Sequence, residues 1–154
     1  MSGASFVLLC TLELMGRSPE SLPPIKLVDA PVAGASSNVE GYVIAGIPVI
    51  HIVTSTPAFR EADCYDRTTL VKLASIIAHE EWHVRHGRDE RSAYEAQLMT
   101  LMMLGAGPDT GVYHNVRRAM RHVLKAEKES RREAARQQQE PLAATVEAGT
   151  SRSR

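Results

Sequence analysis

The sequence predicts an α+β fold, in which a short twisted β-sheet or hairpin packs on a long buried helix and further helices follow. Two observations predict it. β-Branched and aromatic residues gather on both sides of an Ala-Gly turn in residues 39–54, and from Asp66 onward apolar residues recur with the period of a helix. Because the chain has 154 residues and 44% hydrophobic content, we expect one compact domain with a single core.

Residues 1–24 are predicted to form an N-terminal helix, over residues 5–15, followed by a proline-rich linker. The helix is too short to cross a bilayer, has no positively charged start and contains Glu13. We therefore expect neither a membrane span nor a signal peptide, which favours a cytoplasmic protein.

The two cysteines, Cys10 and Cys64, form neither a C-x-x-C pair nor a framework dense enough for a disulfide-stapled secreted fold. Unpaired cysteines are often buried and behave as small apolar side chains. We therefore expect two buried thiols rather than a disulfide.

Three short strands are predicted ahead of the long helix. Residues 25–30 have a strand-like composition, and Val39 to Ala45 and Ile47 to Thr54 are expected to form the two arms of a hairpin. Pro48 has no backbone N–H to donate to a sheet, so the second arm is predicted to lie at an edge or to start there. In an alternating strand His51 faces away from its isoleucine neighbours, so we expect its side chain to be exposed.

Two helices are predicted to follow the hairpin, separated by a tight turn. The first spans residues 66–86, is largely buried and ends at Gly87. Asp89 is placed to cap the second, which covers residues 90–104 and stops in the loop "GAGPDTG".

A last helix is predicted to begin near Val112 and to run into a segment without large apolar residues, "KAEKESRREAARQQQE". Such a segment cannot bury enough surface to order itself. We therefore expect residues 25–128 to form the folded domain and residues 129–154 to form a charged, disordered tail.

The charges of the chain balance, with 18 basic and 18 acidic residues, so no global field draws it to nucleic acid or to a membrane. A local basic excess in residues 117–137 leaves one alternative open, a helical module that binds nucleic acid or a protein partner. Because glutamates are interspersed and aromatic residues are few, no nucleic-acid partner is expected.

Three of the six histidines, His79, His83 and His86, fall within eight positions at the end of the first long helix. Residues four apart lie about 40° apart around a helix and roughly 6 Å apart along it, so His79 and His83 can bind one ion. Glu80 lies close enough to contact a metal-bound water without being a ligand. The string from His79 to His83 is therefore H-E-x-x-H on a predicted helix, the motif of zinc hydrolases.

A catalytic zinc ion needs a third protein ligand and an open position for water. His86 lies about 10 Å along the helix axis from His79, which is too far for one ion. Beyond the turn, the candidates are Asp89, Glu90 and Glu95. We favour Glu90, which shares a helix face with the stripe expected to pack on the first helix. Asp89 is better placed as an N-cap, and Glu95 lies nearer to solvent.

The string "AHEEWHVRHG", followed by "DERSAYEAQ", resembles the gluzincin branch of the zincin metallopeptidases, in which a glutamate on a second helix completes the zinc site. The string "GYVIAGIPVIHIVTS" resembles the edge strand with which such enzymes hold an extended peptide. The resemblance covers roughly residues 40–105. It implies a minimal zincin-like domain, a Zn²⁺ cofactor and peptide hydrolysis.

A zinc-dependent metallopeptidase is thus the expected function. Glu80 would accept a proton from a zinc-activated water as the general base, and Tyr113 or His114 could help to stabilise the transition state. A peptide or protein substrate would pair with the backbone of residues 48–54 by β-augmentation. The alternatives are a domain that binds metal without catalysis and the helical binding module in residues 117–137.

Overall fold

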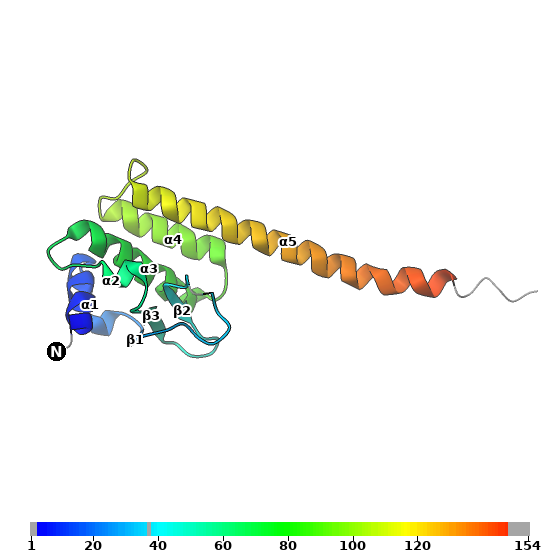
Figure 1. The fold of residues 1–154 in the computed structure, drawn as a ribbon, viewed down its shortest axis with the longest axis horizontal. Coiled ribbons are helices and arrows are strands. Elements are labelled where there is room, and N and C mark those ends of the chain that lie inside the picture. The colour runs from blue at the N-terminus through cyan, green and yellow to red at the C-terminus, as the bar shows by residue number, and fades with distance from the viewer. Residues whose placement is uncertain (1–2, 37, 148–154) are drawn as a thin grey trace, which may run out of the picture.

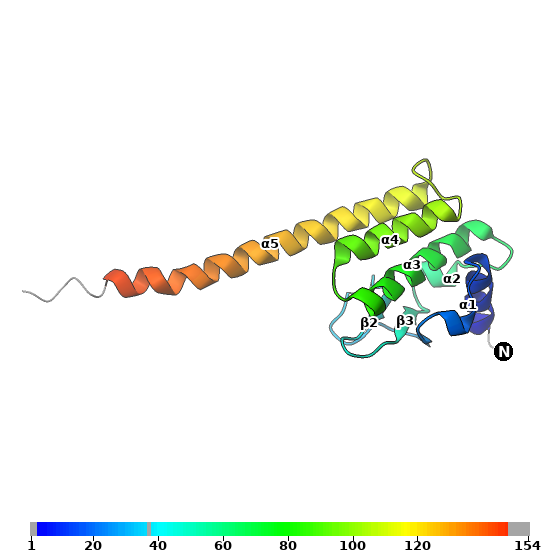
Figure 2. The same cartoon turned by 180° about the vertical axis from the view of Figure 1, so that it is seen from behind.

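The structure is a computed structural model that describes residues 3–36 and 38–147, with side chains up to residue 138. The elements are α1 (Gly3–Leu14), η1 (Pro19–Ser21), β1 (Ile25–Val28), β2 (Gly41–Val43), β3 (Ile50–Val53), α2 (Pro57–Arg60), α3 (Arg67–His86), α4 (Glu90–Met103) and α5 (Gly111–Glu147). The predicted α+β class is confirmed. The sheet and α1 lie on one side of α3, and α4 and α5 lie on the other (Figures 1 and 2).

The three strands form one sheet in the order β1-β3-β2, with β1 parallel and β2 antiparallel to β3. The hairpin was predicted in the right place, but its arms are shorter, and residues 44–49 join them. The prediction of an edge position for residues 48–54 is wrong, because β1 pairs with the other side of β3 and makes it the central strand. Pro48 precedes β3 and therefore never has to donate to the ladder.

The prediction that His51 is exposed is also wrong. Its side chain is only 7% exposed, and the ring of Tyr42 stacks on it with the ring centroids 4.7 Å apart. All four residues of β3 are buried, as is common for a strand covered on both faces. Alternation gives the face on which a side chain lies, but not whether that face is covered.

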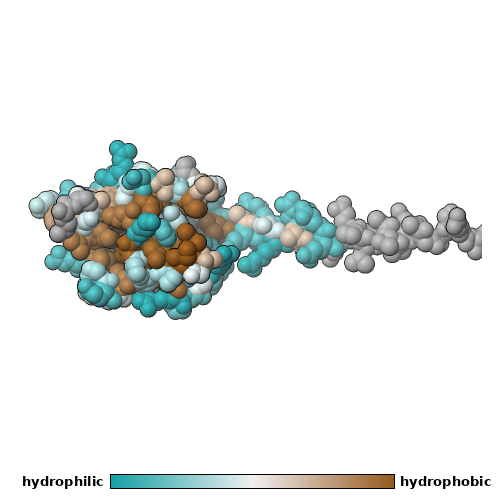
Figure 3. Space-filling view, turned by 90° about the horizontal axis from the view of Figure 1, so that it is seen from below, coloured by the Kyte–Doolittle hydropathy of each residue, from teal (hydrophilic) through white to brown (hydrophobic). Residues whose placement is uncertain are grey.

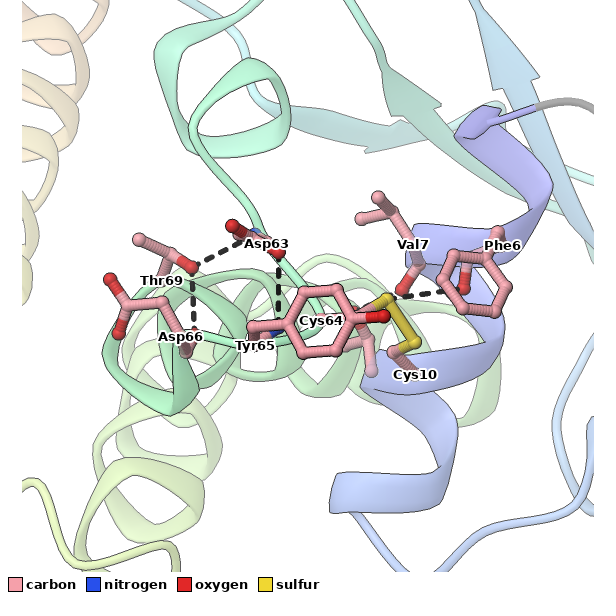
Figure 4. The surroundings of a disulfide bond; sticks show 9 residues. Phe6, Val7, Cys10, Asp63, Cys64, Tyr65, Asp66 and Thr69 are labelled. Atoms are coloured by element: carbon pink, nitrogen blue, oxygen red, sulfur yellow. Dashed lines mark hydrogen bonds between the residues drawn. A yellow bond between two sulfur atoms is a disulfide. The ribbon is translucent and has the colours of Figure 1, made fainter.

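The N-terminal helix belongs to the main core of the domain. Leu12 of α1 is buried in the same cluster as Ile52 of β3 and Leu73 of α3. A disulfide joins Cys10 of α1 to Cys64, which lies shortly before α3 (Figure 4). The expectation of two free thiols is therefore wrong, because the two cysteines meet through tertiary packing across 54 positions of the chain.

Helices α3 and α4 begin and end where the sequence predicted, within a residue or so. Asp66 caps α3 by accepting a hydrogen bond from the backbone N–H of Thr68, and Asp89 caps α4 in the same way through Arg91. Gly87 ends α3 with a φ of 96°, a conformation that favours glycine. This short turn folds the start of α4 back beside the end of α3.

Helix α5 packs on the body through a second apolar cluster that includes Val71, Leu101 and Val116. It then continues away from the body (Figure 1). Residues 129–147, expected as part of a disordered tail, are helical in the structure, and residues 148–154 lie outside the described residues. Alanine, glutamate, arginine and glutamine favour a helix even without packing, and pairs four residues apart add support.

The coloured stretch of α5 that projects from the body is mostly hydrophilic, whereas the body shows an apolar patch with hydrophilic residues around it in the same view (Figure 3). Side chains of residues 129–138 are all exposed, so this part of the helix adds nothing to the core. Within the described part of the chain, no helix combines the length and the apolar character that a membrane crossing requires.

Candidate metal centre

The last turns of α3 place His79, Glu80 and His83 on the side of the helix that faces α4 and β2. His79 and Glu80 are buried and His83 is partly buried. Glu90 opens α4 and meets the two histidines across the turn after Gly87. His79, His83 and Glu90 each offer one ligand atom, and these atoms lie within 4.8 Å of one another.

The spacing of these ligand atoms fits one tetrahedral ion. The Nε2 atoms of His79 and His83 are 3.1 Å apart. The two carboxylate oxygens of Glu90 each face one histidine: Oε2 lies 3.5 Å from Nε2 of His79, and Oε1 lies 3.4 Å from Nε2 of His83. Ligands held about 2.05 Å from a tetrahedral ion are roughly 3.3 Å apart. Two imidazoles and one carboxylate are also a ligand set that suits borderline divalent cations.

The end of α3 fixes the orientation of the His83 ring. Its Nδ1 atom lies 2.7 Å from the carbonyl oxygen of Gly87. Because a carbonyl oxygen only accepts, Nδ1 donates the hydrogen, and Nε2 keeps its lone pair in the neutral ring. Outer hydrogen bonds of this kind orient histidine ligands at metal sites. Nδ1 of His79 is buried and has no hydrogen-bond partner among the described residues.

The other candidate ligands lie outside this group. Asp89 is exposed and caps α4, as predicted, and Glu95 is exposed further along the same helix. His86 stacks on Trp82, with the ring centroids 4.9 Å apart, and its Nδ1 atom contacts the Trp82 carbonyl oxygen. Of the three acidic candidates, the structure brings only Glu90 to the two histidines, within the described residues.

Glu80 lies beside the ligand group, with 6% of its surface exposed. No residue in the described ranges donates a hydrogen bond to its carboxylate. Strand β2 passes directly over it, because a Cβ atom on Gly41 would lie only 3.0 Å from Cγ and 3.2 Å from Oε1 of Glu80. Glycine at this position lets the backbone approach that closely.

The charged groups of the cluster shift one another's pKa. Burial raises the pKa of Glu80 to about 7, against the opposite effect of His79 and His83. Contacts with the two histidines lower the pKa of Glu90 to about 2. For His83, burial lowers the pKa, but contacts with Glu90 and Gly87 outweigh it and the net shift is upward. Glu90 is therefore an anion at neutral pH, suited to a cation, whereas the Glu80 carboxyl exchanges protons near neutrality.

A cavity of about 1170 Å³ opens over these side chains. It is lined by β2 and the loop that follows, by the end of α3, by the first half of α4 and by α5. Apolar side chains of α5, Val116, Ala119 and Val123, contribute to this lining. The volume suits a segment of several residues.

Tyr94 is a residue of the site that was not predicted from the sequence. It lines the cavity, and its ring meets the His79 ring edge-on with the centroids 4.7 Å apart. Burial, followed by Glu90, Glu40 and Glu80, raises the pKa of Tyr94 to about 12, so its hydroxyl stays protonated. Its position four residues after Glu90, on the same helix face, was the available signal.

Tyr113 and His114, the predicted transition-state stabilisers, lie elsewhere. Tyr113 packs on the second apolar cluster, and His114 is exposed. Asn115 and Val116 of α5 line the cavity instead. Neither predicted stabiliser belongs to the cavity lining that the described residues form.

Comparisons of the chain with protein-family models, with curated proteins and with solved structures find no match. The resemblance to gluzincins therefore rests on the two short motifs, and the case for a function rests on the geometry of the site.

Proposed function

We propose that the protein is a zinc-dependent metallopeptidase in which Glu80 acts as the general base. The proposal rests on one observation, the setting of Glu80: a buried carboxylate without a hydrogen-bond donor, beside three potential ligands and on the wall of a cavity. A purely structural zinc site closes around its ion with four protein ligands and needs no general base. Three ligands leave a position for water, which favours catalysis over metal binding alone.

The residues of the chain divide the chemistry between them. His79, His83 and Glu90 would hold the zinc ion, which would supply an acidified water and polarise a peptide carbonyl. Glu80 is placed to accept a proton as the general base and to return it to the leaving amine. A carboxyl group whose pKa lies near 7 can both accept and return a proton at neutral pH.

Tyr94, rather than Tyr113 or His114, is the hydrogen-bond donor in this proposal. Its hydroxyl stays protonated, and Tyr94 lines the same cavity as Glu80 and Glu90. A donor there would stabilise the negative charge that develops on the carbonyl oxygen of the scissile bond.

The substrate is proposed to bind beside β2 instead of residues 48–54. Strand β3 is paired on both sides, so its backbone groups are occupied. Strand β2 pairs with β3 alone and lines the cavity next to Glu80. An extended peptide added to the free edge of β2 would therefore bring its backbone close to the general base.

The disulfide bears on where this activity would operate. Disulfides persist in oxidising compartments and are rare in the reducing cytosol. The bond between Cys10 and Cys64 therefore argues for an oxidising compartment, in place of the cytoplasmic location expected from the sequence.

Cleavage of a mixed peptide library by the zinc-loaded protein tests the proposal, with products identified by mass spectrometry. Glu80→Gln should lower kcat/KM by about 10²–10⁴ while zinc content and fold persist. Glu81→Gln is the matched control, because Glu81 pairs with Arg17 and Arg85, at 2.9 and 2.8 Å, away from the ligands. No cleavage by the zinc-loaded wild type, or equal rates for it and Glu80→Gln, would contradict the proposal.

A further inference from the structure

A second, smaller hollow adjoins the cavity over the metal group. It lies between the start of α4 and the middle of α5, and Glu127 of α5 lines both hollows. The two hollows are therefore neighbours, with Glu127 between them. We name this second hollow the basic groove and define it by its charged residues, which are Asp89, Arg91, Glu127, Lys128, Arg131 and Arg132.

The basic groove has a net positive charge, whereas the charges of the whole chain balance. Four of its six charged side chains are basic, whereas the whole chain has equal numbers of basic and acidic residues. Asp89 caps α4 and Glu127 pairs with Arg131, so both acidic groups are already engaged. Lys128 and Arg132 make no ion pair with any described residue and are exposed. Such a groove attracts negative charge.

The spacing of residues along α5 limits where on a bound peptide the negative charge would lie. Val123 lines the main cavity, and Lys128 and Arg132 follow it by five and nine residues. At a rise of 1.5 Å per residue, the two cations lie about 7 to 14 Å further along the helix. At 100° per residue they also lie about 140° and 180° around the helix axis from Val123, so a peptide has to pass around α5 to reach them. An extended peptide advances roughly 3.3 Å per residue, so the axial distance alone requires about two to four residues, and this count is a lower limit.

We propose that the basic groove binds acidic side chains of the substrate, at least two positions beyond the residue that lies beside Val123. The substrates would then be polypeptides with an acidic segment on one side of the cleaved bond. That the bound peptide is a substrate rests on the proposed function. The binding of an acidic peptide in the groove does not depend on cleavage.

Nucleic acid is the other polyanion that a basic surface could bind. The groove has no aromatic side chain on which a base could stack, and it also holds the carboxylates of Asp89 and Glu127, which would repel phosphates. One of these carboxylates, Glu127, also lines the cavity over the metal group. These features favour an acidic polypeptide.

The test uses the full-length, zinc-loaded Glu80→Gln protein, which should bind peptides without cleaving them. Two labelled peptides are compared by fluorescence anisotropy, one with a run of glutamates that starts at the second position beyond the residue beside Val123 and one with glutamines in their place. The glutamate peptide should bind roughly tenfold more tightly at low salt, and the difference should shrink as the ionic strength rises. The double variant Lys128→Glu, Arg132→Glu should remove the preference.

Arg117→Glu with Arg121→Glu is the matched control, with the same spacing and nearly the same change of charge on the same helix but outside both hollows. Equal affinities for the two peptides, or an equal loss in the control, would overturn the inference. So would a single-stranded oligonucleotide that binds more tightly than the glutamate peptide. Cleavage by the wild type, measured in parallel, separates the two proposals: cleavage without a charge preference contradicts the groove alone, and a preference without cleavage contradicts only the peptidase.

Discussion

Gly41 leaves no room for a side chain between β2 and Glu80. A methyl group on Gly41 would lie 3.0 Å from Cγ of Glu80 and 3.1 Å from Ile76, so Gly41→Ala should push the carboxylate aside by a few tenths of an ångström. Small displacements of a catalytic group are costly, and we expect kcat to fall about tenfold with zinc still bound. Gly111→Ala is the control, because nothing lies within 4 Å of its Cβ position. Equal kcat values for the two variants would contradict this account of Gly41.

Removal of the Tyr94 hydroxyl distinguishes the hydrogen-bonding role of this residue from its packing role. Tyr94→Phe keeps the ring that meets His79 but removes the donor. We expect kcat to fall about 10²-fold with little change in KM or in zinc content. Tyr113→Phe should have no such effect, since Tyr113 packs on the second cluster. The opposite pattern, with Tyr113→Phe the impaired variant, would restore the assignment made from the sequence.

At the scale of the elements, the disulfide ties α1 to the segment that leads into α3. Because it closes a loop of 54 residues, chain-entropy arguments assign it about 4 kcal/mol, and typical values are about 2–4 kcal/mol. The double variant Cys10→Ala, Cys64→Ala should lose that much free energy of unfolding in guanidinium titrations. Added reductant should then have no further effect on the variant. A loss below about 1 kcal/mol would mean that core packing alone holds α1 in place.

The helices of the site could be predicted from the sequence because their signals are local. Asp66 and Asp89 are N-caps, Gly87 is a helix end, and apolar residues recur with a helical period between them. The same local geometry brought His79 and His83 together and suggested Glu90 as their companion. Contacts between residues within about one turn of a capped helix could therefore be predicted from the sequence.

The sheet order, the burial of His51 and the disulfide could not be predicted in this way. The sheet order and the disulfide depend on contacts between segments far apart in the chain, β1 with β3 and Cys10 with Cys64. Tyr42 and His51 are partners within the predicted hairpin, but the sequence pattern does not tell that this face of the hairpin is covered. Pro48 suggested an edge strand, but it lies before the ladder begins. The close approach of Gly41 to Glu80 also joins distant segments, β2 and α3, so it could not be predicted from the sequence.

At the scale of the whole molecule, a metal ion would join α3 to α4, since it takes two ligands from one helix and one from the other. An ion that binds only the folded chain stabilises it by about 2.7 kcal/mol at a free concentration 100-fold above its Kd. For a chain of this size that raises Tm by roughly 5–10 °C. Calorimetry with zinc and with a chelator should show this shift in the wild type and in His86→Ala, but not in His83→Ala. A shift that persists in His83→Ala would place the ion elsewhere.

The proposed function requires an open zinc site made by His79, His83 and Glu90 beside a general base. Elemental analysis of the purified, zinc-reconstituted chain detects that site without any substrate. We expect about one zinc per chain in the wild type and in Glu80→Gln, and loss of the metal in His83→Ala and Glu90→Ala. Absence of zinc from the reconstituted wild type, or equal zinc in all four proteins, would contradict it.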